Sequence, residues 1–144
     1  MKKHAYNYNT ATLLQDYDRL FSNVLPPVIF GDTKQNYPPH NICKITDTHY
    51  RIELAIVGLK KENIDIKLAE KILSIVHRKE QEPSQSSEIG YIHLGISTRN
   101  FELHFKLDDD LVVRDDVKLE NGLLTIDLDL VVPESKKPKS FSIK

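Results

Sequence analysis

The chain has 144 residues, of which 40% are hydrophobic, and this is enough for one domain with tails but too little for two full domains. Its formal net charge of -1, from 20 basic and 21 acidic residues, excludes a global field that would favour nucleic acid or an anionic membrane. The N-terminus turns polar where a signal peptide needs an apolar stretch, and no apolar run approaches membrane-spanning length. We therefore expect a cytoplasmic protein, and the single cysteine, Cys43, which cannot form an intramolecular disulfide, agrees with a reducing compartment.

Residues 1–36 show no strand alternation, and we expect a short amphipathic helix followed by an apolar arm. Thr12 and Gln15 are placed like a capping box, and Pro26-Pro27 ends the helix by Leu25. Apolar clusters separated by prolines and polar spacers are typical of a loosely held, adhesive segment. The alternative is a helix that completes the core of the domain. The apolar side chains of this arm are Leu13, Leu14, Tyr17, Leu20, Phe21, Val28, Ile29 and Phe30.

Residues 37–133 have the pattern of strands bounded by turns, which predicts an all-β, immunoglobulin-like β-sandwich of about eight strands. The alternation is clean in residues 49–56, whose even-numbered apolar side chains are expected to face inward, and a short edge strand at 42–45 precedes it. A reversal at Glu70-Lys71 separates the next two strands. The remaining expected strands cover 64–68, 73–77, 101–107 and 111–113.

A long polar loop interrupts this series. Residues 81–88 are charged and then serine-rich, with almost nothing to bury, yet residues 89–94 have the composition of a strand. A strand on such a loop must pair with some edge, and we expect it to pair with a second subunit. The alternative is a strand folded back on its own sheet. The side chains of this expected dimer strand are Ile89, Tyr91, Ile92 and Leu94.

Residues 117–130 combine turn chemistry with strand periodicity. Asn121-Gly122 is a pair that a tight hairpin turn with positive φ angles prefers. From Leu124 onward, apolar residues alternate with Thr125, Asp127 and Asp129, which predicts a strand with one buried face. The chain therefore reverses at this turn and pairs two strands across the same core.

Three motifs occur in a fixed order along the chain. Phe101, Phe105 and Leu107 alternate in one strand, Val117 stands four residues before Asn121-Gly122-Leu123-Leu124, and residues 131–138 read Val-Val-Pro-Glu-Ser-Lys-Lys-Pro. Together they resemble the small heat shock proteins, the α-crystallin-related chaperones, in their bacterial inclusion-body-binding branch. The resemblance runs from about residue 37 to the C-terminus. Leu103 and Val117 replace the arginine and the alanine of the family's motifs, so its arginine-based interface contacts are not carried over.

The resemblance implies an α-crystallin-type sandwich at 37–133 between the N-terminal arm at 1–36 and an extended C-terminal tail at 134–144. It also implies an ATP-independent holdase chaperone, not an enzyme, that binds unfolding proteins without a cofactor and prevents their irreversible aggregation. The apolar side chains of the arm would then bind the client proteins. The implied partners are these clients, further copies of the chain as dimers and larger homo-oligomers, and ATP-dependent chaperones for client release, with no nucleic acid and no membrane.

The last residues of the tail also resemble the family. Phe141-Ser142-Ile143 is similar to its anchor of isoleucine-x-isoleucine, whose alternate side chains point the same way in an extended peptide and can enter one groove. In the family this groove lies between two strands that correspond here to 64–68 and 113–119. The alternative is a frayed terminus without a partner. The implied groove residues are Ile64, Ile66, Leu68, Val113, Val117 and Leu119.

The sequence shows no constellation of catalytic or metal-binding residues. The five glycines form no phosphate loop, and the six histidines form no helical i, i+4 pair. Asp108-Asp109-Asp110 lacks the alternating acidic pattern of a calcium loop and is better explained as a solvated turn. Two rivals to the chaperone remain: a monomeric β-sandwich co-chaperone adaptor, and a small enzyme, which would need a titratable cluster in a closed pocket.

Overall fold

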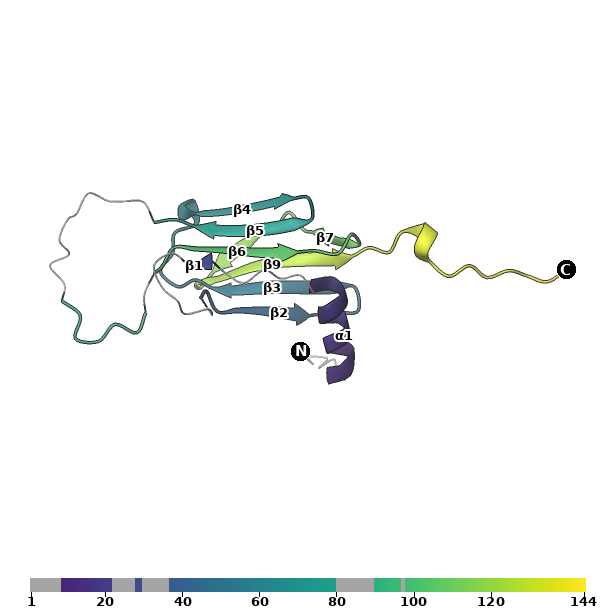
Figure 1. Cartoon of the computed structure of the whole chain (residues 1–144), viewed down its shortest axis with the longest axis horizontal. Helices are drawn as coiled ribbons and strands as arrows, with labels where there is room; N and C mark the ends of the chain where they lie inside the picture. The colour runs from purple at the N-terminus through teal and green to yellow at the C-terminus, as the bar shows by residue number, and fades with distance from the viewer. Residues whose placement is uncertain (1–8, 22–27, 30–36, 80–89, 97) are drawn as a thin grey trace.

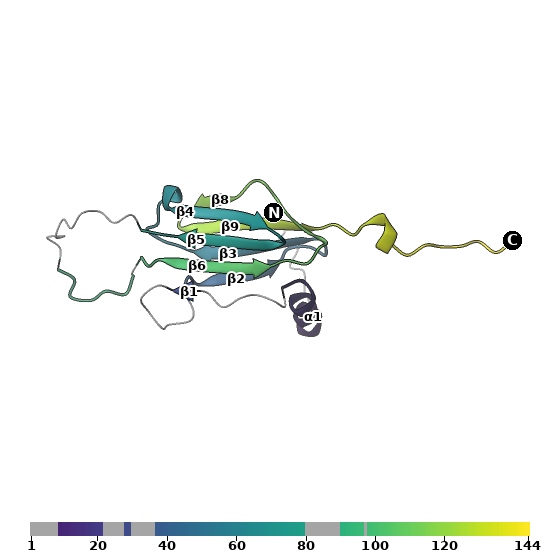
Figure 2. The ribbon, with the colours of Figure 1, turned by 45° about the horizontal axis from the view of Figure 1, so that its top comes forward.

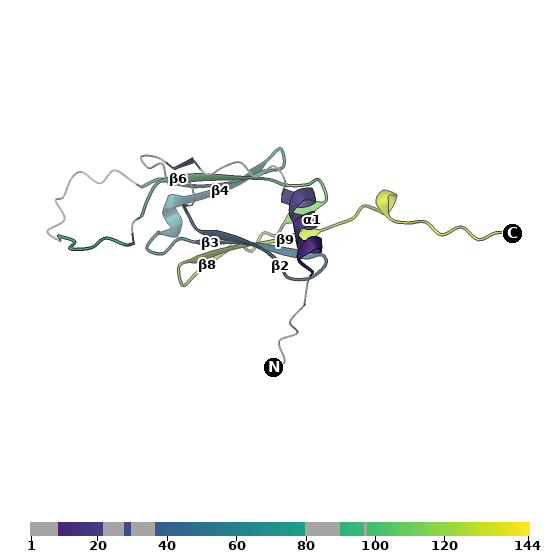
Figure 3. The ribbon, with the colours of Figure 1, turned by 60° about the horizontal axis from the view of Figure 1, so that its bottom comes forward.

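Nine short strands form two antiparallel sheets that face each other in a computed structural model, which describes residues 9–21, 28–29, 37–79, 90–96 and 98–144 (Figure 1). Figure 3 shows the two sheets as separate layers, with helix α1 at one end. The first sheet contains, in spatial order, β1 (Val28–Ile29), β6 (Phe101–Lys106), β5 (Ile72–His77) and β4 (Ile64–Ala69). The second contains β2 (His40–Lys44), β3 (His49–Ala55), β9 (Leu123–Leu130) and β7 (Leu111–Val113), with β8 (Lys118–Glu120) also paired to β9. The predicted all-β sandwich is therefore confirmed.

Alternation decides which side chains form the core between the sheets. In β3 and β9, Ile52 lies opposite Ile126, and in β5 and β6, Ile75 lies opposite Leu103; all four are fully buried. Leu103, which stands at the family's arginine position, is thus a core residue here. Two-residue β1 pairs with β6, a contact that the sequence pattern did not predict.

Two tight turns are made by residues with positive φ. Asn121 (φ 54°) and Gly122 (φ 77°) join β8 to β9, as the Asn-Gly pair predicts. A Cβ atom added at Gly122 would lie 2.7 Å from the Cγ2 atom of Val57, so this position needs glycine for space as well as for conformation. The reversal between β4 and β5 uses Glu70 and Lys71, both with positive φ and neither a glycine.

Helix α1 (Thr10–Phe21) begins earlier than expected. The side chain of Asn9 caps it by accepting a hydrogen bond from the backbone N–H of Ala11 at 3.0 Å, so the capping box predicted at Thr12 and Gln15 is wrong. Leu20 and Phe21 are only 2% and 1% exposed and belong to the core cluster. The expectation that the sandwich does not require these two side chains is therefore also wrong, because they cover one end of the core. No helix among the described residues is long and apolar enough to cross a membrane.

Candidate functional site

Helix α1 carries three apolar side chains of the arm that remain accessible. Leu13, Leu14 and Tyr17 are exposed and line a cavity of about 270 Å³ between the helix and strands β2 and β3. The predicted arm residues thus fall into two groups, because Leu20 and Phe21 face the core. Phe30 lies outside the described residues, and the side chains of Val28 and Ile29 are likewise not described.

Asp16 holds α1 to the second sheet, a role that sequence reasoning missed. Its carboxylate accepts hydrogen bonds from the Nζ atom of Lys44 at 2.5 Å and from the Tyr50 hydroxyl at 3.1 Å. Burial alone would raise the pKa of Asp16, but these two hydrogen bonds outweigh it and hold the pKa below its ordinary value. The signal in the sequence was a carboxylate on the same helical face as Leu13 and Leu20, at i, i+3 and i, i+4 spacing. The ring of Phe21 packs against that of Tyr50, with centroids 6.2 Å apart.

The expected dimer strand lies away from the sheets. Residues 90–96 extend beyond the sandwich at the end opposite to the C-terminal tail, and in this single chain they form no strand (Figure 1). Tyr91, Ile92 and Leu94 are exposed, and so is Ile96, which the sequence analysis did not include. Ile89 lies outside the described residues. The folded-back strand that was the alternative is absent from residues 90–96.

The residues expected to form the anchor groove lie along one side of the sandwich. Figure 2 shows β4 and β8 on that side, and β1 and β2 on the other. Five of the six residues are half-buried and pack against the core: Ile64, Ile66, Val113, Val117 and Leu119. Leu68 is exposed near the end of β4. The edges of the two sheets, at β4 and at β8, therefore carry a row of apolar side chains that are only partly buried, and we call this row the apolar seam.

The C-terminal tail leaves the sandwich after β9 and extends away from it (Figures 1 and 3). A short 3-10 turn, Glu134–Lys136, interrupts the expected extended course, and Lys136 forms an ion pair with Asp110 at 3.2 Å. Beyond this turn Phe141 and Ile143 are 87% and 100% exposed. Within this chain the tail therefore presents both apolar side chains to solvent.

The outer face of the second sheet carries a network of charged side chains. Asp127 on β9 is 7% exposed and accepts hydrogen bonds from the Nε atom of Arg51 at 2.8 Å and from the ring of His49 at 2.8 Å. Burial raises the pKa of Asp127, but the hydrogen bonds from Arg51 and His49 lower it by more, so the carboxyl titrates below its ordinary value. Arg114 binds Asp129 with two hydrogen bonds, which lower the pKa of Asp129.

One hydrogen-bonded trio on the outer face of the first sheet has the connectivity of a hydrolytic triad. The hydroxyl of Ser74 lies 2.8 Å from Nδ1 of His104, whose Nε2 atom lies 3.0 Å from the carboxylate of Glu102. However, β5 is paired on both sides, to β4 and to β6, so the backbone N–H groups around Ser74 belong to the sheet ladders and none is available as an oxyanion donor. The trio is therefore a surface hydrogen-bond chain between neighbouring strands.

The described residues contain no cluster of three or more His, Cys, Asp or Glu side chains suited to hold a metal ion. Cys43 is half-buried in β2, and burial is the main cause that raises the pKa of its thiol. A raised pKa makes the thiolate scarce and the thiol a poor nucleophile.

Comparison with known proteins gives a consistent result. The model of the Hsp20/alpha crystallin family matches residues 42–144, more than half of the chain. The small heat shock protein IbpA of Serratia proteamaculans is 36% identical over 130 residues, covering 89% of each chain. IbpA of Escherichia coli is 35% identical over 127 residues, covering 88% of each chain.

Solved structures point the same way. The small heat shock protein AgsA of Salmonella typhimurium, as a C-terminally truncated chain, superimposes with a TM-score of 0.59 at 29% identity; the match covers 74% of this chain and 98% of that one. A small heat shock protein of Synechococcus phage S-ShM2 superimposes with a TM-score of 0.57 at 34% identity, over 74% of this chain and 99% of that one. The likeness therefore extends from sequence to fold.

Proposed function

The chain belongs to the Hsp20/alpha crystallin family, the small heat shock proteins, and on that premise we propose that it is an ATP-independent holdase chaperone. It binds unfolding proteins and prevents their irreversible aggregation. The observation that carries this proposal is the placement of apolar side chains outside a complete core, on α1, on residues 90–96 and on the tail. Exposed apolar surface of this kind marks sites of protein interaction.

The proposed mechanism is mass action and needs no catalysis. A chaperone that binds unfolded chains competes with their association into aggregates, and the bound fraction depends only on the two affinities and concentrations. Refolding then requires release, which we assign to ATP-dependent chaperones. We place the protein in the cytoplasm, with no nucleic acid or membrane among its partners.

Clients are held by the accessible apolar side chains of α1. Leu13, Leu14 and Tyr17 border an apolar cavity and are accessible, whereas Leu20 and Phe21 serve the core, so we leave these two out of the proposed client set. Val28, Ile29 and Phe30 stay in that set as part of the arm. We retain the division into arm, sandwich and tail at residues 1–36, 37–133 and 134–144, with α1 docked on the sandwich.

Assembly uses two further segments. We propose that residues 89–94 pair with the sheet edge of a second subunit and form the dimer, since Tyr91, Ile92 and Leu94 are apolar and exposed, and residues 90–94 lie outside any strand in the single chain. Deleting residues 85–94 should yield folded monomers by analytical ultracentrifugation, and an unchanged dimer would contradict this role. The tail residues Phe141 and Ile143 would enter the seam between β4 and β8 of a neighbouring subunit.

The holdase activity is tested by light scattering from a heat-denatured enzyme without ATP. Deleting residues 1–36 is not a clean test, because it would remove Leu20 and Phe21 from the core. We therefore choose serine at Leu13, Leu14 and Tyr17 together. This variant should stay folded by circular dichroism and lose most of its suppression of aggregation, whereas the matched control Val112→Ser, an exposed apolar side chain on β7, should retain it.

Two outcomes would overturn the proposal. Full suppression by the triple serine variant would remove the helix face from the client site. A monomeric particle mass, measured by light scattering on the full chain, would favour the co-chaperone adaptor, because such a module needs neither the apolar segment at 90–96 nor an anchor at the end of the tail.

A further inference from the structure

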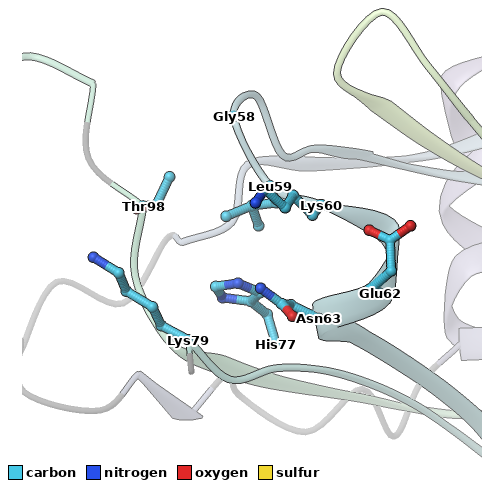
Figure 4. Close-up of a pocket in the computed structure, with 8 residues that line it drawn as sticks. All are labelled: Gly58, Leu59, Lys60, Glu62, Asn63, His77, Lys79 and Thr98. Carbon is cyan, nitrogen blue, oxygen red and sulfur yellow. The ribbon is translucent and has the colours of Figure 1, made fainter. Parts of the chain in front are cut away.

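A cavity of about 450 Å³ lies at the end of the sandwich where β5 stops, away from the surfaces described above (Figure 4). Three segments far apart in the sequence form it: the turn and 3-10 helix before β4, the end of β5, and the approach to β6. Its lining residues are Gly58, Leu59, Lys60, Glu62, Asn63, His77, Lys79 and Thr98.

His77 is the buried polar group of this cavity, and it is 2% exposed. Its Nδ1 atom lies 2.8 Å from the carbonyl oxygen of Arg99, so Nδ1 must carry the proton and donate. The ring stacks on Phe101, with centroids 5.8 Å apart and planes inclined by 29°, which fixes its orientation. Within the described residues Nε2 makes no hydrogen bond.

The Nε2 atom of His77 therefore determines which chemical group a ligand in the cavity must carry. In the neutral ring Nε2 is an acceptor, and a buried acceptor is nearly always satisfied by a donor. Figure 4 shows the ring facing the space that Lys60, Asn63 and Thr98 surround. A ligand in this space should carry a proton for Nε2.

The surrounding charges favour an anion. In Figure 4 the side chain of Lys60 lies across the space from His77, whereas the side chain of Lys79 and the carboxylate of Glu62 point away from the ring. The ammonium group of Lys60 attracts negative oxygens, and charge-assisted hydrogen bonds to it are stronger than neutral ones. The amide of Asn63 and the hydroxyl of Thr98 can orient further oxygens.

We propose that this cavity binds a small oxyanion that carries a proton, of the hydrogenphosphate type. At neutral pH inorganic phosphate has both requirements, a P–OH group that donates to Nε2 of His77 and negative oxygens that accept from Lys60. The cavity is larger than one such ion, and the remaining volume holds several waters at about 30 Å³ each. Sulfate matches hydrogenphosphate in shape and charge but has no proton to donate.

Equilibrium dialysis of the full chain against radiolabelled inorganic phosphate tests the site and does not depend on particle size. At constant ionic strength the unaltered protein should bind about one phosphate per chain, and Lys60→Gln should weaken binding about tenfold, the loss expected for one charge-assisted hydrogen bond. Lys61→Gln is the matched control, since this exposed neighbour does not line the cavity. His77→Phe keeps the aromatic stacking and should abolish saturable binding.

Competition with unlabelled salts tests the proton requirement. Unlabelled phosphate should displace the label, and sulfate should do so at least about tenfold less well, because one hydrogen bond to the ring is missing. Equal competition by sulfate would refute the assignment of His77 as acceptor. The absence of saturable binding, or equal weakening by Lys61→Gln and Lys60→Gln, would refute the site itself.

Discussion

Replacing Asp16 by alanine should release α1 from the sandwich. The carboxylate accepts one hydrogen bond from Lys44 and one from Tyr50, and hydrogen bonds to charged groups contribute about 1.5–3 kcal/mol each. Part of this loss is compensated, because the Lys44 ammonium also lies 3.7 Å from Asp47. A net loss of about 2–3 kcal/mol remains, which is a factor of about 30 to 150 in the ratio of docked to released helix.

Losing the hydrogen bonds of Asp16 should have a large effect, because few other contacts hold α1 on the sandwich. Burial of Leu20 and Phe21 contributes about 1.5–3 kcal/mol each. The two hydrogen bonds of Asp16 are of the same size as this burial, so removing Asp16 should make the released state common.

Hydrogen exchange read by mass spectrometry measures this release directly. Amides of residues 10–21 should exchange at least about tenfold faster in Asp16→Ala, since exchange follows the population of the open state. Asp18→Ala is the matched control, because Asp18 is an exposed carboxylate on the same helix. The reasoning is refuted if both variants exchange alike. If α1 holds clients, its release should also increase suppression of aggregation, because Leu20 and Phe21 become accessible.

Three further predictions concern the sandwich and the tail. The pKa of Asp127 in the folded chain lies below its ordinary value of 3.8, so the stability it contributes is present above that pH and is lost as the pH falls through the lowered pKa; acid unfolding followed by circular dichroism should lose this component in Asp127→Asn. Gly122→Ala should destabilise the fold by about 1–3 kcal/mol in urea melts, whereas Gly90→Ala, with open space around its position, should change stability by less than about 0.5 kcal/mol. Alanine at both Phe141 and Ile143 should shift the particle mass toward dimers without unfolding the sandwich, and an unchanged mass distribution would show that the tail is not the anchor.

The strands could be predicted because alternation and burial obey the same period. Tyr50, Ile52 and Leu54 face inward as their spacing requires, and the Asn121-Gly122 turn occurs where its chemistry places it. β1 could not be predicted, because two residues are too few to show a period. Its pairing depends on the open edge of β6, which only the folded sheet provides.

The docking of α1 shows a second limit of pattern reasoning. An amphipathic face looks the same in sequence whether it covers a core or faces solvent, so Leu20 and Leu13 could not be told apart by spacing alone. Only the fold distinguishes the two leucines, because the partners that hold Asp16 are Lys44 on β2 and Tyr50 on β3, which are distant in the sequence. The cavity at His77 could not be predicted from the sequence for the same reason. Three segments that are distant in the sequence form it, and alternation predicts only that the His77 side chain points inward.

The tail and the sandwich together imply an assembly of many weak contacts. Seating Phe141 and Ile143 in the seam of a neighbour would contribute about 1.5–3 kcal/mol each, while ordering each tail residue costs about 1–2 kcal/mol. From Pro133 the eight residues to Phe141 span roughly 22 Å, at about 2 Å per residue in the 3-10 turn and about 3.3 Å per residue beyond it, which is enough to reach another subunit. One tail therefore binds weakly, and several tails acting together hold the particle through their effective concentration. Subunits joined in this way should exchange readily.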